Sequence, residues 1–283
     1  MSSEFPGLEA VGERALLDTL LPTVREAHRT RRSIGTWFEF GGGRVYLKGS
    51  ALRGRVRVRH LLRERVLRRE LPRLAEYANL AWLRARGFRA AEPLAAGAVR
   101  ATGSATYQFL ATREVPGART LDAALADANP DARTLCLIEL GRLVGRLHGL
   151  GFVHRDLYPR NLLVTGETYA GEIHLIDAWR GGPRPQLRGP DYDHACLLLE
   201  GAELFTPEEQ RAYFDAYFGE TGADRETRRR TLGLVAGERD ALARRTVARA
   251  LRRERRLALA EGRAPEARRA EFPRWDPRAL LDS

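Results

Sequence analysis

The chain has 283 residues with 48 Lys or Arg, 37 Asp or Glu and a formal net charge of +11. This length is sufficient for two lobes with a sizeable core, and no apolar run approaches the roughly 18 to 20 residues of a membrane span. The charge predicts an acidic partner, such as anionic lipid, phosphorylated glycan or nucleic acid. The first residues lack the pattern of a secretory signal, and Cys136 and Cys196 lack disulfide or metal spacing. We therefore expect a cytoplasmic protein with reduced thiols.

The first third of the chain predicts a helix followed by a hairpin. Residues 8–29 have an amphipathic helical pattern, which Pro22 is expected to break or restart. Residues 37–40 alternate as a strand, and the three glycines 41–43 lead into a second strand that ends at Lys48. The stretch 33–36 is a weaker candidate for a loop that covers phosphates.

Lys48 is the only lysine among the 48 basic residues. A chain this rich in arginine is expected to keep a lysine only where a guanidinium substitutes poorly. One such place is a strand from which a compact ammonium reaches the α and β phosphates of a nucleotide. Lys48 is therefore a candidate nucleotide-binding residue.

A basic stretch and a long helix follow this strand. Residues 51–73 hold nine arginines and two glutamates, which fits either an arm that contacts an anionic acceptor or membrane, or a solvated helix. The next helix is expected from Pro72 to Arg86, closed by Gly87. Glu76 lies early in it, where a carboxylate can pair with Lys48 and orient it. The alternative is a solvent-facing glutamate of the kind common near helix starts.

Two further strands, at 94–100 and 105–113, precede a rigid turn at residues 114–117. We expect this turn to connect two lobes, with the backbone of Glu114 and Val115 receiving an adenine ring. The predicted domains are an N-terminal lobe, 1–113, and a C-terminal lobe, 114–283. A strong helix at 131–149 opens the second lobe and leads into the most informative motif of the chain.

That motif is His154-Arg155-Asp156-Leu157, followed by Asn161 and, after a short strand, by Asp177. It matches the catalytic-loop pattern H-R-D-L-x-x-x-N with a later metal-binding aspartate. Asp156 is the candidate base for an attacking hydroxyl. Asn161 and Asp177 offer hard oxygen ligands to Mg²⁺, so the pattern predicts binding of ATP and Mg²⁺.

The segment after Asp177 reads Ala-Trp-Arg, and no Ala-Pro-Glu sequence follows it. A peptide-docking platform is therefore not expected. Asp193 is expected to brace the backbone of the catalytic loop, with a simple helix N-cap as the alternative. Helices are predicted at 195–204 and 207–218.

Residues 225–270 hold fifteen arginines against six acids, interspersed with apolar residues. Such a segment can lie on an anionic membrane or pack on a lobe with its charges solvated. It has no aromatic residue for base stacking, and we expect no nucleic-acid partner.

Taken together, these motifs resemble the lipopolysaccharide kinase family (the WaaP/InaA and Kdo kinase group). The resemblance covers about residues 30–218 and is most specific in Asp177-Ala-Trp-Arg180. It implies an α+β, protein-kinase-like bilobal fold with a small β-rich N-lobe and a larger, mainly helical C-lobe. It also implies ATP- and Mg²⁺-dependent phosphorylation of a sugar hydroxyl, Kdo or heptose, in the inner core of a glycolipid at the cytoplasmic face of the inner membrane. Arg160, four residues after Asp156, is a candidate contact for the transferred phosphoryl group from spacing alone.

Two other functions fit the same motifs. One is a small-molecule kinase of the aminoglycoside or choline type, which also has a short segment after the metal-binding aspartate. The other is a pseudokinase that binds nucleotide or anionic membrane, although the retention of Lys48, Asp156, Asn161 and Asp177 argues against it.

Overall fold

The computed structural model describes residues 7–166, 171–183, 188–261, 272 and 275–280. Two parts of the sequence discussed above lie outside the described residues. They are residues 1–6 at the start and residues 262–270 of the basic segment 225–270. The helices are α1 (Arg14–Arg29), α2 (Gly54–Arg65), α3 (Pro72–Ala85), α4 (Leu121–Ala126), α5 (Pro130–Gly149), η1 (Pro159–Asn161), α6 (Pro190–Leu204), α7 (Pro207–Thr221), α8 (Arg225–Glu261) and η2 (Pro277–Leu280). The strands are β1 (Leu8–Gly12), β2 (Ile34–Phe40), β3 (Gly43–Ala51), β4 (Pro93–Ala101), β5 (Ser104–Arg113), β6 (Arg119–Thr120), β7 (Leu162–Thr165) and β8 (Glu172–Leu175).

The chain forms two compact units. Unit 1 contains residues 1–118, 163–166 and 172–182, and unit 2 contains the remainder. The predicted C-terminal lobe, 114–283, includes residues 163–166 and 172–182, whereas in the structure these segments pack with the first unit. A small antiparallel sheet and a mainly helical second part agree with the predicted α+β, protein-kinase-like fold.

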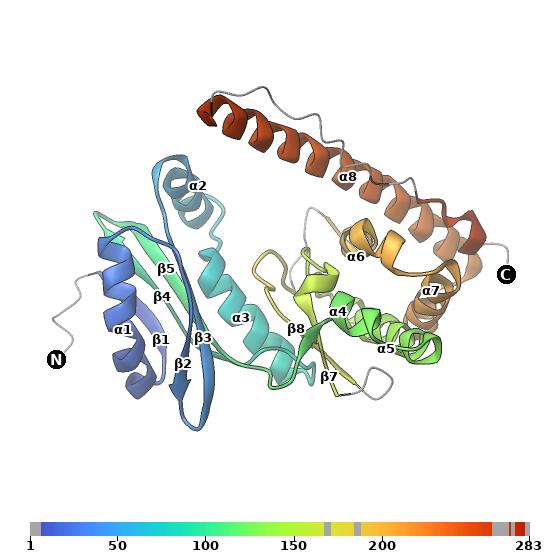
Figure 1. Ribbon diagram of the computed structural model, residues 1–283, viewed down its shortest axis with the longest axis horizontal. Helices are drawn as coiled ribbons and strands as arrows, with labels where there is room; N and C mark the ends of the chain where they lie inside the picture. Colours follow the sequence, from blue (N-terminus) through green and yellow to red (C-terminus); the bar gives the residue numbers. More distant parts are fainter. Residues whose placement is uncertain (1–6, 167–170, 184–187, 262–271, 273–274, 281–283) are drawn as a thin grey trace. The chain divides into compact units, whose positions relative to one another are not determined.

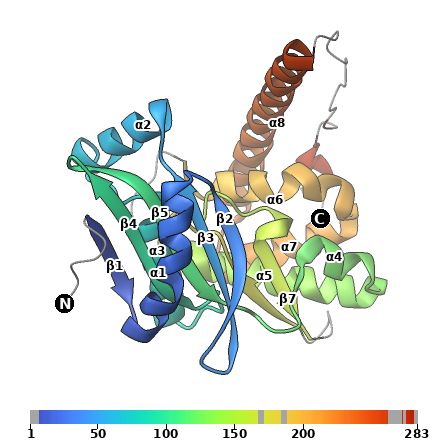
Figure 2. The same ribbon diagram turned by 60° about the vertical axis from the view of Figure 1, so that its left-hand side comes forward.

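Unit 1 is built on a five-stranded antiparallel sheet in the order β1-β4-β5-β3-β2. Helices α1 and α3 lie on opposite faces of this sheet (Figures 1 and 2). Because side chains alternate along a strand, neighbouring residues of β3 serve different faces. Leu47 is buried in the core under α1, whereas the side chain of Lys48 bonds to α3. This alternation places the single lysine on the side of the sheet that carries the polar cluster described below.

The predicted helix at 8–29 is wrong at its start, because residues 8–12 form β1 and pair with β4. The helix begins at Arg14 and passes through Pro22 without interruption. Pro22 is exposed, so the carbonyl that loses its hydrogen bond lies on the solvent side. A buried apolar face holds the helix on the sheet, and it consists of Leu16, Leu20, Val24 and Ala27.

The predicted hairpin is confirmed. Phe40 pairs with Gly43 across the two-residue turn Gly41-Gly42, and both turn glycines have positive φ, +60° and +74°. Glycine reaches this left-handed conformation without steric cost, which is why such turns join twisted strands. As a consequence, residues 34–36 lie in an edge strand paired with residues 47–49 and not in a loop.

Unit 2 is a helical body in which α5 packs on α7 and α6 packs on α8. Close helix approach depends on Gly141 of α5, where an added Cβ would lie 2.3 Å from the Tyr213 carbonyl oxygen. The helix predicted at 195–204 begins earlier, at Pro190, because proline suits the first turn of a helix. The helix predicted from Pro207 is present and starts with a Thr206–Glu209 capping box.

Helix α8 carries much of the basic C-terminal segment. Within unit 2, α8 buries Leu232, Val235 and Leu242. Its residues Leu251, Leu257 and Leu259 are exposed. Its C-terminal half extends beyond α6 (Figure 2). Among the described residues, no helix has the length and apolarity needed to cross a bilayer.

Candidate active site

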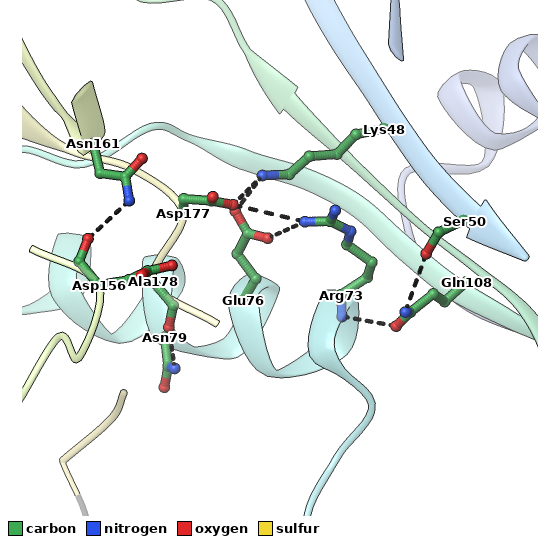
Figure 3. A network of polar contacts seen from close by, with 10 residues as sticks. All are labelled: Lys48, Ser50, Arg73, Glu76, Asn79, Gln108, Asp156, Asn161, Asp177 and Ala178. Carbon is green, nitrogen blue, oxygen red and sulfur yellow. Dashed lines mark hydrogen bonds and ion pairs between the residues drawn. The ribbon is translucent and has the colours of Figure 1, made fainter. Parts of the chain in front are cut away.

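The polar cluster of unit 1 is centred on Lys48. Its Nζ donates to Glu76 Oε1 at 2.6 Å and to Asp177 Oδ1 at 2.8 Å (Figure 3). The three residues come from β3, α3 and the segment after β8, which are distant in the sequence. The expected pairing of Lys48 with Glu76 is therefore present, and Asp177 joins the same ammonium.

Arg73 adds a second cation to this cluster, from the first turn of α3. Its Nη1 lies 2.8 Å from Glu76 Oε2 and 3.7 Å from Asp177 Oδ1. Two cations thus face two carboxylates, so the cluster is close to neutral before any ligand binds. The backbone N–H of Arg73 also donates to Gln108 Oε1 at 3.1 Å, and Gln108 Nε2 donates to Ser50 Oγ. These two bonds connect α3 to the sheet (Figure 3).

The two carboxylates have different environments. The Glu76 side chain is 1% exposed, and this burial raises its pKa despite the nearby Lys48 and Arg73. Burial also acts to raise the pKa of Asp177, but the charge and hydrogen bond of Lys48 outweigh it, and the pKa of Asp177 lies below its usual value. Asp177 is 35% exposed. Glu76 is thus an enclosed partner of the lysine, whereas Asp177 is an accessible carboxylate.

Asp177 is held by a constrained turn. Its φ is +60°, a left-handed conformation that costs energy for a residue other than glycine and that often occurs at functional sites. Asn79 of α3 stabilises the following residues, because its Nδ2 donates to the carbonyl oxygens of Ala178 at 2.6 Å and Gly181 at 3.2 Å. Helix α3 therefore positions both the Glu76 carboxylate and the Asp177 segment.

A pocket of about 570 Å³ lies over this cluster within unit 1. Its charged part contains Lys48, Arg73, Glu76 and Asp177, and its apolar part includes Ile34, Ala91 and Leu163. Glu114 and Val115 line it as well. The Glu114 side chain accepts from Arg44 Nη1 at 2.8 Å, and the Glu114 N–H donates to the Arg44 carbonyl oxygen. One pocket thus combines an apolar wall, residues 112–115 and a compact group of charges.

The catalytic-loop motif lies in unit 2, where Asp193 holds its backbone. The Asp193 carboxylate is fully buried and accepts from the N–H groups of His154, at 2.7 Å, and Arg155, at 2.5 Å. The bracing predicted for Asp193 is confirmed. His148, at the end of α5, bonds to the same carboxylate at 3.1 Å and to the Tyr217 hydroxyl at 3.2 Å. Arg155 has a φ of +61°, so this loop also contains a left-handed residue.

Two further predicted residues, Asn161 and Arg160, lie at the end of this loop. The Asn161 Nδ2 donates to the backbone carbonyl oxygen of Asp156 at 2.8 Å, which leaves the Asn161 carbonyl oxygen as an acceptor (Figure 3). Arg160 is 52% exposed, and it forms an ion pair with Glu200 at 2.6 Å and stacks over the Tyr158 ring. A contact of Arg160 with a phosphoryl group stays a prediction and would require exchange of Glu200 for that group.

Three residues of these networks were not predicted from the sequence, namely Arg73, Asn79 and His148. Arg73 lies three residues before Glu76, a spacing that places both on one helix face. Asn79 lies on the same face as Glu76 and the buried Leu80 and Leu83, and an amide there requires a partner. The helical spacing of Arg73 and Asn79 could have been recognised from the sequence. The bonding partners of Asn79 and His148 could not, because they lie far along the chain.

A lysine paired with a helix glutamate, an aspartate after a short strand and a braced H-R-D loop define a protein-kinase-like protein. The description "Lipopolysaccharide kinase (Kdo/WaaP) family" belongs to a family model that matches residues 19–197, which is more than half of the chain. The chain belongs to this family. Membership confirms the predicted resemblance and the predicted class of enzyme, an ATP-dependent kinase.

Two solved structures and one curated relative are also similar to this chain, and the first of these structures shows the fold alone. WaaP in complex with acyl carrier protein is 19% identical with a TM-score of 0.57, covering 82% of this chain and 97% of that chain. The bifunctional kinase-methyltransferase WbdD is 17% identical with a TM-score of 0.42, covering 82% of this chain and 51% of that one. A probable serine/threonine-protein kinase of Dictyostelium discoideum is 36% identical over 73 residues, which is 25% of this chain but only 5% of that relative's length.

Proposed function

We propose that this chain transfers the γ-phosphoryl group of ATP to a sugar hydroxyl, of Kdo or heptose, in the inner core of lipopolysaccharide or a similar glycolipid. The observation that carries the proposal is the Lys48 ammonium, the only lysine of the chain, held 2.6 Å from a buried glutamate and 2.8 Å from an accessible aspartate in one pocket. This geometry leaves a compact cation directed at phosphate oxygens.

In this proposal the pocket of unit 1 binds the nucleotide. The backbone of Glu114 and Val115 receives the adenine edge, and the apolar wall covers the ring faces. Lys48 binds the α and β phosphates while Glu76 keeps its orientation. Because Glu76 is almost fully buried, the lysine cannot lose this partner to solvent.

Mg²⁺ suits the donor set that the chain offers. The Asp177 carboxylate is partly exposed and the carbonyl oxygen of Asn161 is not used by its bond to Asp156. Mg²⁺ is typically bound by one or two carboxylates together with substrate phosphates and waters. We infer that Asp177 and Asn161 would hold the ion, which would supply positive charge to stabilise the transferred group.

Asp156 is proposed as the base that accepts the proton of the attacking sugar hydroxyl. Three backbone contacts hold its loop, two from Asp193 to residues 154 and 155 and one from the Asn161 side chain to the Asp156 carbonyl. A base must stay within hydrogen-bond reach of the proton that it removes, which such bracing provides. We place the reaction at the inner face of the inner membrane, where the acceptor would be presented.

The test is incubation with γ-labelled ATP and Mg²⁺ against a panel of acceptors. It contains inner-core glycolipids that lack one phosphate, aminoglycosides and choline. Label in the glycolipid supports the proposal if it is absent with three variants that still melt cooperatively. These variants are Lys48→Ala, Asp156→Ala and Asp177→Ala. Label only in a small molecule assigns the alternative kinase type, and ATP binding without any transfer assigns a pseudokinase. Full transfer by Asp156→Ala would remove the proposed mechanism.

A further inference from the structure

A second pocket of unit 1 is formed by helix α2 and by the two residues that follow the Asp177-Ala178 turn, Trp179 and Arg180. Its volume is about 710 Å³, within the roughly 300–1,000 Å³ typical of sites for small ligands. The nucleotide pocket and this pocket share no lining residue. The second pocket is therefore a separate cavity in the same unit.

Helix α2 contributes little to the core of unit 1. Among its twelve residues only His60 is buried. Val58 and Leu62 are more than half exposed, as is Leu67 just after the helix, and all three line the pocket. Apolar side chains left in solvent around a concave surface are a common feature of binding sites. The pocket side of α2 therefore leaves apolar side chains accessible to a ligand.

The basic residues of this pocket are incompletely neutralised. Arg55, Arg59 and Arg63 line it from α2. Glu64, one of the two acids in the 51–73 stretch, is bound by Arg100 at 2.6 Å. In the parts of the chain that the structure covers, neither Arg55 nor Arg59 has a carboxylate partner. Exposed guanidinium groups of this kind bind phosphate and carboxylate groups through paired hydrogen bonds.

His60 is the one buried residue of α2, and it contributes to the wall of the pocket. The Nδ1 of His60 is enclosed and has no hydrogen-bond partner among the described residues, and His60 lines the pocket. Trp179 lines the same pocket and offers a ring face on which a sugar can pack, while the Arg180 guanidinium lies over the ring, 4.8 Å from its centre. Cationic, apolar and aromatic groups in one cavity suit an anionic saccharide next to a lipid.

The two pockets are linked by one short segment. Asp177 lines the nucleotide pocket, whereas Trp179 and Arg180, two and three residues later, line the second pocket. The Trp179 N–H donates to the Asp177 carbonyl oxygen at 2.9 Å, and Asn79 fixes the carbonyl oxygens of Ala178 and Gly181. A ligand held at Trp179 is consequently placed beside the aspartate proposed to carry Mg²⁺.

We propose that the pocket between α2 and Trp179-Arg180 binds the acceptor, through the phosphate or carboxylate groups of an anionic, lipid-linked saccharide. This inference rests on the proposed function and adds a location for the acceptor. Arg55 and Arg59 bind the anionic groups, Trp179 packs on a sugar ring, and the exposed apolar residues of α2 cover the start of the lipid chain.

The test compares binding of three probes: a deacylated, phosphorylated inner-core oligosaccharide, the same oligosaccharide after dephosphorylation, and phosphatidylglycerol vesicles. The proteins are the wild type, Arg55→Ala/Arg59→Ala and the control Arg252→Ala/Arg253→Ala, which removes the same charge from exposed positions of α8. Loss of two charge-assisted contacts should weaken binding of the phosphorylated oligosaccharide by about tenfold or more in the first variant only. ATP binding, measured by thermal shift, should not change in either variant.

Tryptophan fluorescence gives a second readout. Quenching by the phosphorylated oligosaccharide should disappear in Trp179→Phe, because the other three tryptophans lie outside this pocket. Equal loss in both double variants, equal binding of the dephosphorylated oligosaccharide, or a response to vesicles alone would overturn the inference. Binding that follows the expected pattern without phosphoryl transfer to any acceptor would refute the proposed function and leave the pocket intact.

Discussion

The burial of Glu76 makes a quantitative prediction about its ion pair with Lys48. We consider the double-mutant cycle of Lys48→Met and Glu76→Gln. Opposite unit charges about 4 Å apart attract by about 4 kcal/mol at an effective dielectric constant of about 20. The Nζ–Oε1 distance is 2.6 Å and the glutamate is 1% exposed, so screening by water is weak. Desolvation offsets part of this attraction, and we expect a coupling free energy of about 2–3 kcal/mol.

The assay is urea unfolding followed by tryptophan fluorescence. Three of the four tryptophans, Trp37, Trp82 and Trp179, belong to unit 1 and therefore report mainly on the unit that contains the pair. The control cycle uses Arg29 and Glu26 of α1, which form an ion pair at 2.8 Å with side chains 75% and 58% exposed.

The exposed control pair should couple much more weakly, because water screens both of its charges. The difference between the two cycles isolates the effect of burial, because both pairs lie in unit 1 and have similar distances. A Lys48–Glu76 coupling no larger than the control value would refute the reasoning that Glu76 holds the lysine through an enclosed contact.

Three further predictions concern the site and its support. Lys48→Arg keeps the charge but replaces a point cation between two carboxylates by a planar group, and phosphoryl transfer should fall by about a hundredfold in an initial-rate assay. Asn79→Leu leaves the Ala178 and Gly181 carbonyl oxygens without their donor, so kcat should fall by about tenfold while ATP binding by calorimetry is retained; an unchanged kcat would contradict the role of Asn79. His194 is fully buried. Its burial, and to a smaller extent the charge of the nearby His148, lowers its pKa well below 6.5. Below pH 6.5 the unfolded state therefore binds more protons than the folded state, and the melting temperature should drop between pH 7 and pH 5. The drop should be less steep in His194→Phe. Parallel pH profiles of the two proteins would argue against this assignment.

Local features of the sequence predicted those parts of the fold that depend on neighbouring residues. The glycine pair of the β2–β3 turn, Pro72 at the start of α3 and Gly87 after its end each act within a few residues. The motif that contains Asp156 and Asn161 could also be recognised from the sequence, because all of its residues lie in one short stretch.

Features that depend on distant partners were not predictable in this way. Residues 8–12 have no local signal that distinguishes a strand from a helix end, and they become β1 by pairing with residues 95–99 of β4. Pro22 lies in a continuous helix because the packing of Leu16, Leu20 and Val24 on the sheet outweighs its roughly 3 kcal/mol cost. In both cases tertiary contacts override a local preference.

The two cations of the unit 1 cluster are chemically different, and the difference suits the proposed reaction. Arg73 binds Glu76 through a planar guanidinium and its backbone N–H is fixed by Gln108, so it has little freedom to leave. The Lys48 ammonium is a compact donor at the end of a flexible chain, and it can keep Glu76 while exchanging Asp177 for a phosphate oxygen. Asp177 would then be free to bind a metal ion. In the proposed reaction, the one lysine among 48 basic residues stands at the position where a donor would have to change partners during each catalytic cycle.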